Sequence, residues 1–311
     1  MTSHSHPQLS RLFLTDAGLE TDILFNKGID LPHFASITLF QSEVGRDALN
    51  QYYRDFLELA ERMGTGIILE SATWRASSDW QEPLGLSQQE LTDLNGQAIS
   101  MLLLLKDEFK KSISDVVVSG CIGPRGDGYD PGQVMEAEQA REYHLPQGHT
   151  LHLAGADMLS AITMTNIPEA IGIAQMARDI AADVVVSFTV ETDGKLPTGD
   201  TLRTAIEAVD TATNAYPAYY MINCAHPAHF VPVLEENADW VKRICGVRAN
   251  ASRCSHAELD AMTQLDKGDF AELATLHGEL RARFPHITVV GGCCGTDLTH
   301  VTAIAEACVA A

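Results

Sequence analysis

Short apolar runs alternate with longer amphipathic stretches along nearly the whole chain, and this alternation constrains the fold more than any other feature. The stretch over 46–63 has apolar residues at helical spacing. The stretch over 87–111 begins at Ser87 with Glu90 three residues later, which is the pattern of a capping box. The apolar runs are predicted strands over residues 12–16, 66–73, 116–124, 156–163, 184–190, 219–224, 241–249 and 287–290.

Eight strand–helix units in series predict a parallel sheet with right-handed crossovers. In a chain of 311 residues they favour a closed (β/α)8 TIM barrel of the α/β class, whose strands are buried on both faces. A doubly wound open sheet is the alternative. No Pro- or Ser-rich linker divides the chain, so we predict a single domain over residues 1–311, with a disordered tail over residues 1–9.

The formal charge of 21 − 42 = −21 argues against nucleic acid or an anionic membrane as a partner. No apolar stretch is long enough to cross a membrane, and residues 1–7 lack the apolar segment of a secretory signal. We therefore expect a cytoplasmic protein with reduced thiols that acts on small molecules. A homo-oligomer is compatible with the sequence.

Polar side chains fall where the predicted strands end. Asp16 ends the first strand, Thr73 the second, Glu191 the fifth and Cys224 the sixth, and the pair Cys293-Cys294 ends the eighth. In a (β/α)8 barrel, catalytic groups lie at the carboxyl ends of the strands. The pattern therefore predicts an active site at this end of the barrel.

The run Gly-Gly-Cys-Cys-Gly-Thr over 291–296 indicates a metal site. Adjacent cysteines rarely form a disulfide with each other, but the flanking glycines permit a bend that turns both thiols toward one ion. Cys224 ends a strand that lies near the eighth one around a barrel. With Cys293 and Cys294 it would supply three thiolates to Zn2+ and leave a fourth position open.

Other interpretations of these residues stay open at this point. Cys224 could be an ordinary core cysteine, and the double cysteine could be incidental to a glycine turn. His226 and His229 follow Cys224 closely and are alternative zinc ligands, and Cys254 is a further candidate in a loop. The other cysteines are predicted to pack within strands or the last helix: Cys121, Cys245 and Cys308.

The pair Asn223-Cys224 together with the 291–296 run resembles the homocysteine S-methyltransferase family. The segments LTDAGLET (14–21), TWRAS (73–77), IGP (122–124) and SFT (187–189) are similar to further stretches of that family. The resemblance implies a (β/α)8 barrel, Zn2+ held by the three cysteines, and a thiol acceptor, usually homocysteine, as the fourth ligand. The resemblance implies that Asp16 and the backbone around Ala17 and Gly18 lie beside the acceptor. We also expect Glu20, Thr73, Arg75, Glu191 and Asn223 to lie beside the substrates.

The chemistry requires a metal-activated sulfur and a positively charged methyl donor. A free thiol is mostly protonated at neutral pH, and only the thiolate is a good nucleophile. A donor such as S-methylmethionine, S-adenosylmethionine or betaine carries its methyl group on a cation, which an aromatic face can hold. Trp74, Trp80 and Tyr129 are the candidate aromatic residues. Methyl-folate is less favoured, because one barrel fills the chain.

The sequence departs from the family at three places. Ala17 stands where the family usually has glycine. The acid that commonly follows the fourth strand is missing from residues 160–164, so either Glu191 or Glu70 holds the amino group of the acceptor, or the acceptor is not homocysteine. Arg75 replaces a neutral residue and could clamp a substrate carboxylate, or could face solvent or pair with Asp79.

Two other functions compete with methyl transfer. A zinc-dependent barrel hydrolase would use the metal to activate water, although three thiolates would weaken its acidity. A thiol redox sensor would use the adjacent cysteines without catalysis.

Overall fold

The computed structural model describes residues 6–235 and 237–310, and its strands close into a barrel. All eight strands are parallel and follow the order of the chain, and β8 pairs with β1. The predicted (β/α)8 barrel is therefore confirmed, and the open sheet is excluded. The strands are β1 Phe13–Leu14, β2 Gly66–Glu70, β3 Val116–Ile122, β4 Met158–Met164, β5 Val184–Phe188, β6 Tyr220–Asn223, β7 Ile244–Ala249 and β8 Val289–Gly292.

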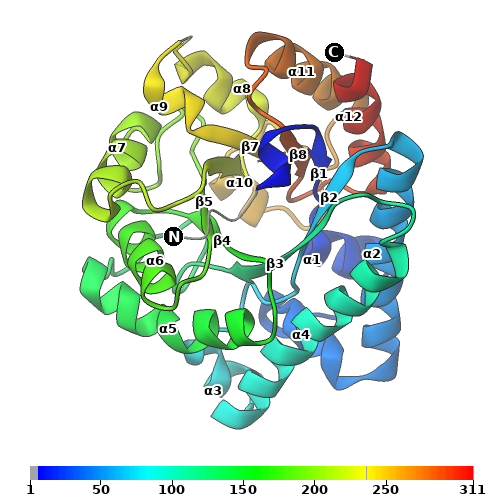
Figure 1. The fold of residues 1–311 in the computed structure, drawn as a ribbon, viewed down its shortest axis with the longest axis vertical. Coiled ribbons are helices and arrows are strands. Elements are labelled where there is room, and N and C mark those ends of the chain that lie inside the picture. Colours follow the sequence, from blue (N-terminus) through cyan, green and yellow to red (C-terminus); the bar gives the residue numbers. More distant parts are fainter. Residues whose placement is uncertain (1–5, 236, 311) are drawn as a thin grey trace.

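Helices surround the strand ring, as Figure 1 shows. Their starts follow local capping chemistry: Ser87 and Glu90 form the predicted capping box, and the Ser42 side chain accepts a hydrogen bond from the amide of Gly45. The helices are α1 Leu19–Thr21, α2 Glu43–Met63, α3 Gln81–Leu84, α4 Gln88–Phe109, α5 Ala137–Leu153, α6 Ile167–Asp179, α7 Leu202–Thr213, α8 Pro227–Phe230, α9 Asp239–Lys242, α10 His256–Asp260, α11 Phe270–Arg283 and α12 Leu298–Ala310.

The sixth unit differs from the expected strand–helix repeat. Only the short helices α8 and α9, with a turn of 3-10 helix over Val231–Val233, connect β6 to β7. Pro227 and Pro232 lie in this connection, and proline is compatible with the first turn of a helix but not with its interior. The crossover is therefore made of single turns.

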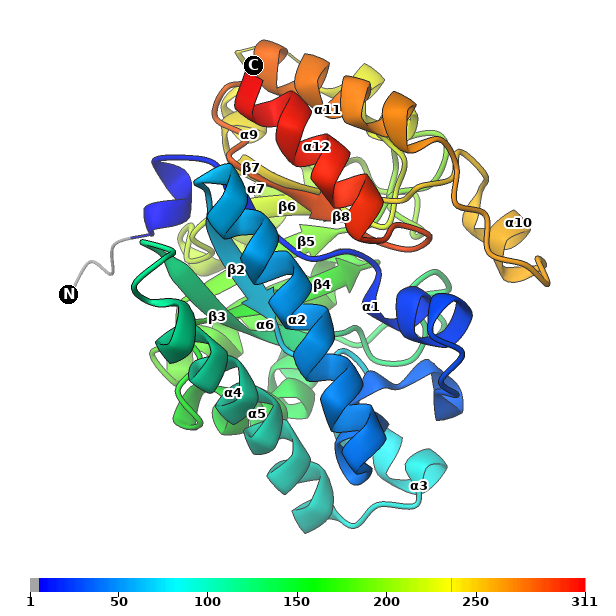
Figure 2. The ribbon, with the colours of Figure 1, turned by 90° about the vertical axis from the view of Figure 1, so that its right-hand side faces the viewer.

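The N-terminal segment closes the end of the barrel opposite to α1 and α10 (Figure 2). Pro7–Leu9 form a turn of 3-10 helix, Gln8 is buried, and its carbonyl accepts a hydrogen bond from the Thr288 hydroxyl at 2.6 Å. The disordered tail predicted over 1–9 is thus wrong for residues 7–9, while residues 1–5 lie outside the described part. Within that part, no helix combines the length and apolarity needed to cross a membrane.

The side chains inside the barrel change character along its axis. Strand residues alternate between the helix-facing core and the interior, because successive side chains of a strand point to opposite faces. Toward the closed end the interior is apolar, and toward the carboxyl ends the same alternation places Glu70, Ser119, Ser160, Asn223 and Arg248 inside. The apolar interior residues are Phe13, Ile68, Val117, Met158, Val185, Tyr219, Met221 and Val289.

Candidate functional site

A cavity of about 410 Å³ opens at the carboxyl ends of the strands. Cys224, Cys293 and Cys294 line it, together with Trp74 and Tyr129. Its lining side chains also carry six carboxylates and two guanidinium groups: Asp16, Glu20, Glu70, Asp127, Asp260 and Asp266, with Arg75 and Arg248. The strand ends thus place a sulfur cluster inside a strongly acidic pocket.

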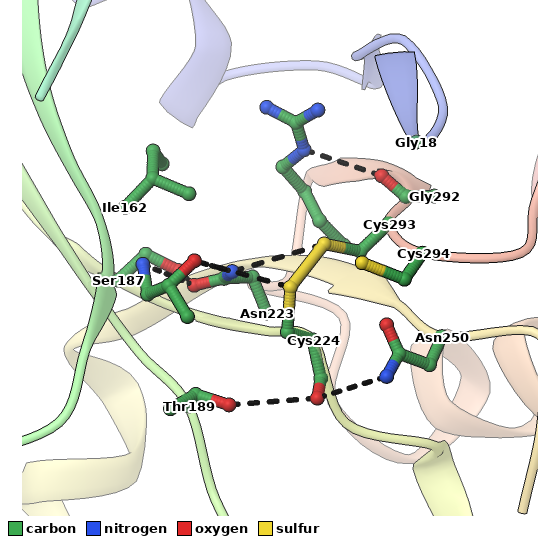
Figure 3. The surroundings of a disulfide bond; sticks show 12 residues. Gly18, Ile162, Ser187, Thr189, Asn223, Cys224, Asn250, Gly292, Cys293 and Cys294 are labelled. Atoms are coloured by element: carbon green, nitrogen blue, oxygen red, sulfur yellow. Dashed lines mark hydrogen bonds between the residues drawn. A yellow bond between two sulfur atoms is a disulfide. The ribbon is translucent and has the colours of Figure 1, made fainter. Parts of the chain in front are cut away.

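The three cysteines meet as predicted. Their sulfur atoms all lie within 4.8 Å of one another, and within the described residues they are the only such group of potential metal ligands. Figure 3 shows Cys224 and Cys293 joined by a disulfide, with Cys294 beside them as a free thiol. The expectation that the adjacent cysteines stay unpaired with each other is met.

Backbone geometry turns Cys224 toward the cluster. Its φ of 53° lies in the left-handed region, which side-chain-bearing residues rarely adopt. Its carbonyl oxygen accepts hydrogen bonds from the side-chain Nδ2 of Asn250 at 3.1 Å and from the His256 ring at 2.6 Å. The Thr189 hydroxyl lies at 3.4 Å from the same oxygen. These contacts hold the unusual conformation, and such strain is typical of functional sites.

The side chain of Asn223 lies beside the cysteine cluster and bonds to the neighbouring strands. Its side-chain oxygen accepts hydrogen bonds from the Thr163 amide at 2.9 Å and the Ser187 hydroxyl at 2.6 Å. Its side-chain nitrogen donates to the Thr163 hydroxyl at 2.8 Å and lies 3.9 Å from the Cys293 sulfur. Asn223 is buried and does not line the cavity. The sequence predicts substrate contact for Asn223; in the structure its side chain bonds to Thr163 and Ser187 and lies beside Cys293.

The end of β1 lies directly against the end of β8. A Cβ atom on Gly18 would come within 2.5 Å of the Cys293 carbonyl oxygen, so no larger residue fits there. The Gly18 amide lies 3.3 Å from the Thr296 hydroxyl. Ala17, where the family usually has glycine, lines the cavity, and its amide lies 3.2 Å from the Tyr52 hydroxyl.

Arg248 is the charged residue that the sequence reasoning missed. It projects from β7 into the barrel, and its guanidinium donates to Oδ1 of Asp16, whose Oδ2 lies 3.2 Å from the Tyr52 hydroxyl. A second nitrogen lies 3.9 Å from the Glu70 carboxylate. All four groups are buried. An arginine within an otherwise apolar strand is the sequence signal that could have revealed it, because arginine is almost never buried without a partner.

Glu191 and Thr73 do not line the cavity. Glu191 contacts the His256 ring at 2.9 Å, and that ring in turn reaches the Cys224 carbonyl. The Thr73 hydroxyl donates to the Cys121 carbonyl at 2.6 Å. Both residues therefore act through neighbours, while Asp16, Ala17, Gly18, Glu20 and Arg75 lie at the cavity wall.

Arg75 pairs with Asp127 at 3.2 Å and not with Asp79, whose carboxylate contacts Arg125 at 2.7 Å. Its guanidinium also lies over the rings of Trp74 and Trp80, with centroid distances of 5.1 and 4.8 Å. Trp80 does not line the cavity. Of the aromatic candidates, Trp74 and Tyr129 line the cavity, and the Tyr129 ring also stacks on His256 with 3.9 Å between the ring centroids.

The alternative zinc ligands point elsewhere. The His226 ring accepts a hydrogen bond from the Ala228 amide at 3.2 Å, and His229 contacts the Arg253 carbonyl at 3.0 Å. Cys254 lies 3.9 Å from the Asp266 carboxylate. Cys121, predicted as a packing residue of its strand, is buried but also lines the cavity floor.

The donor set fits a thiophilic metal ion. Burial raises the pKa of the Cys294 thiol, and the hydroxyl of Tyr129, 3.3 Å from its sulfur, acts against that rise. Three thiolates this close would repel one another, so a cation is needed to keep them ionised together. A cluster of sulfur donors alone is typical of zinc, whereas hydrolytic zinc sites use histidine and carboxylate ligands more often.

Fold and site together define a (β/α)8 barrel protein with a three-cysteine centre in a cavity at the carboxyl ends of its strands. Residues 13–308 match the homocysteine S-methyltransferase family. The chain belongs to this family and is a methyltransferase, as the resemblance implied. No curated protein sequence matches it significantly.

Solved structures of the homocysteine methyltransferase MmuM from Escherichia coli share the fold. The oxidized form superposes with a TM-score of 0.73 at 19% sequence identity, and the match covers 94% of both chains. The metallated form gives a TM-score of 0.71 at 19% identity, covering 95% of this chain and 96% of that one. At this level of identity the comparison shows a common barrel and leaves the substrates to be argued from the site.

Proposed function

We propose that the protein is a zinc-dependent cytoplasmic S-methyltransferase that moves a methyl group from a small onium donor to the thiol of homocysteine, giving methionine. The observation that carries the proposal is the set of three sulfurs from β6 and β8, within 4.8 Å of one another at the cavity wall. The existence of a metallated form of MmuM supports the metal.

In the reduced protein, Cys224, Cys293 and Cys294 would hold the zinc ion. When bound, such an ion supplies the charge that deprotonates a thiol joining it at an open position. The surrounding residues hold the ligands in place: His256 and Asn250 at the Cys224 carbonyl, and Tyr129 at the Cys294 sulfur. Outer-shell contacts of this kind orient metal ligands and tune their basicity.

The charge of the cavity favours a cationic donor. Six carboxylates face two guanidinium groups in its lining, and negatively lined clefts raise the local concentration of cations. Trp74 and Tyr129 add aromatic surface to the same wall. In the transfer itself the sulfur of the acceptor forms a bond to the methyl carbon, the bond from that carbon to the onium centre breaks, and the donor leaves as a neutral molecule.

The test uses purified protein kept reduced and supplied with zinc. We expect about one zinc ion per chain and methionine formed from homocysteine with at least one of S-methylmethionine, S-adenosylmethionine or betaine, detected by mass spectrometry. Cys224→Ser is expected to lower zinc affinity and methyl transfer by more than about 100-fold, because outer-shell partners alone contribute about 10- to 100-fold.

Cys254→Ser is the matched control, since Cys254 is a partly buried thiol outside the cluster. It is expected to leave zinc content and transfer unchanged. Zinc-free protein that transfers methyl groups at the full rate would overturn the metal dependence. Absence of methionine with every donor, at full zinc occupancy, would overturn the assignment of homocysteine as acceptor.

A further inference from the structure

Glu70 stands apart from the other carboxylates of the cavity. Its side chain is only 4% exposed, it lines the cavity floor, and neither carboxylate oxygen has a hydrogen-bond partner among the described residues. The hydroxyls of Ser119 and Ser160 lie close enough to lower the pKa of Glu70, but at 2.6 Å they bond to each other. At most one hydroxyl proton remains for a carboxylate that offers about four acceptor positions.

The other five carboxylates are either satisfied or open to solvent. Asp16 contacts Arg248 and Tyr52, Glu20 accepts from Ser36 at 2.8 Å, and Asp127 contacts Arg75. Asp266 accepts from the Ser252 hydroxyl and the Gly268 amide, and Asp260 is exposed. Glu70 is thus the one cavity carboxylate in the described chain that is both buried and without a hydrogen bond.

The charge balance around Glu70 calls for a cation. Arg248 is the one buried cation in contact with this group, and it already donates to Asp16 while its other nitrogen lies 3.9 Å from Glu70. Two buried carboxylates facing one guanidinium leave one negative charge uncompensated. A buried carboxylate without a full partner either takes up a proton or gains a cationic partner, so a ligand ammonium group that reaches Glu70 would be held there in its ionised form.

The ligand group must also donate hydrogen bonds. Both oxygens of Glu70 are acceptors when the carboxyl is ionised, and a sulfonium or quaternary ammonium centre has no N–H or O–H to offer them. A primary ammonium carries three donors. The unmet acceptors therefore distinguish an amino group from the methylated centre of a donor.

Glu70 lies within reach of a thiol acceptor held at the cysteines. Glu70 ends β2, and Cys293 directly follows β8; only β1 separates the two strands, so the gap is two strand spacings, about 10 Å in total. Four bonds separate the sulfur of homocysteine from its nitrogen. With a metal–sulfur bond at one end and a hydrogen bond at the other, this span matches the gap.

We propose that Glu70 binds the primary ammonium group of the thiol acceptor and so selects amino thiols. This inference rests on the proposed function, because it takes the acceptor sulfur to sit at the three cysteines. Glu191, the other acid considered for this role, contacts His256 and does not line the cavity.

The test compares two thiols in binding to the zinc-loaded protein by calorimetry: homocysteine, and its desamino analogue with hydrogen in place of the amino group. The wild-type protein is expected to prefer homocysteine by about 10- to 100-fold, the range of a hydrogen bond to a charged group. In Glu70→Gln this preference is expected to fall to a few-fold, with binding of the desamino thiol nearly unchanged.

Glu191→Gln is the matched acid control and is expected to keep the wild-type preference. Equal binding of the two thiols by wild-type protein, or an unchanged preference in Glu70→Gln, would overturn the role of Glu70. Because the wild-type comparison needs no substitution, the inference stays testable even if the variant does not fold. Failure of the wild-type protein to bind either thiol would instead contradict the proposed function.

Discussion

The two halves of the barrel interior differ sharply, although the same strands build both. Toward the closed end the interior holds Phe13, Val185 and Met221 in an apolar cluster. Two residues further along the strands from Ile68, Val185 and Gly246, the inward positions hold Glu70, Ser187 and Arg248, all buried. The half at the closed end is a packed apolar core, and the half at the carboxyl ends of the strands is a polar layer that borders the cavity.

This contrast separates stability from function within one barrel. The apolar half gains free energy from burial and packing. The polar half instead holds charged groups whose desolvation is costly unless each is paired. Glu70 is only partly paired, with Arg248 at 3.9 Å, and its two oxygens gain hydrogen-bond donors when the acceptor binds. Four substitutions test this division, from the largest expected effect to the smallest.

Arg248→Met is expected to lower the free energy of unfolding by about 3 to 5 kcal/mol, because it leaves Asp16 and Glu70 buried without their cation. Denaturant unfolding measures the change. Adding Asp16→Asn is expected to restore part of the loss. Arg141→Met instead removes two ion pairs at the surface, with Glu138 and Asp179, and is expected to change stability by less than about 1 kcal/mol. If Arg248→Met lowered the free energy of unfolding by no more than Arg141→Met does, the stability of the polar layer would not depend on Arg248.

Met221→Ala in the apolar half is expected to cost about 2 to 4 kcal/mol of unfolding free energy, since it opens a cavity beside Gly246. The preference between homocysteine and its desamino analogue is expected to stay at the wild-type value. Ser187→Ala in the polar half removes the hydrogen bond to Asn223 and is expected to cost only about 1 kcal/mol. A changed thiol preference in Met221→Ala would break the division between the two halves.

Glu70→Gln is expected to give the smallest effect on stability, with a characteristic pH dependence. Burial raises the pKa of Glu70 above its ordinary value of 4.5, and the charge of Arg248 acts against this rise. The folded state therefore binds the proton more tightly, so the free energy of unfolding falls as the pH rises above 4.5. The variant lacks this loss, and we expect it to be more stable than the wild type at neutral pH without ligand.

The exposed Glu90 is a control in which the pKa shift has the opposite direction to that of Glu70. Hydrogen bonds from the Ser87 amide and hydroxyl lower its pKa, so its contribution to stability is present at neutral pH and is lost in acid. Glu90→Gln is expected to reduce stability slightly at neutral pH. Parallel pH profiles of Glu70→Gln and the wild type, from thermal unfolding at several pH values, would contradict the assigned shift.

Much of the fold could be predicted from local pattern. Each of the eight strands overlaps a predicted apolar run, because parallel strands buried on both faces give continuous apolar segments. The capping box at Ser87 could also be predicted, because it depends only on two residues that lie three positions apart in the sequence. The short crossover over 227–242 was missed, because prolines there limit helices to single turns.

The site could be predicted only in part. The cysteine cluster followed from strand order, since the strand ends carrying Cys224 and Cys293 were expected at the same end of the barrel. Thr73, Glu191 and Asn223 also follow strands, but each is directed to a protein partner rather than to the cavity. Which side of a strand end a side chain takes depends on barrel tilt and on neighbouring loops, and no local pattern specifies either.

The sequence by itself determined the order of strands and helices and put the three cysteines at the ends of two strands, because hydrophobic periodicity and residue type are local properties. Only the tertiary structure decided that Arg248 neutralises Asp16 and leaves Glu70 without a full partner. Those residues lie on strands β7, β1 and β2, and their charges interact only once the barrel closes and excludes water between them.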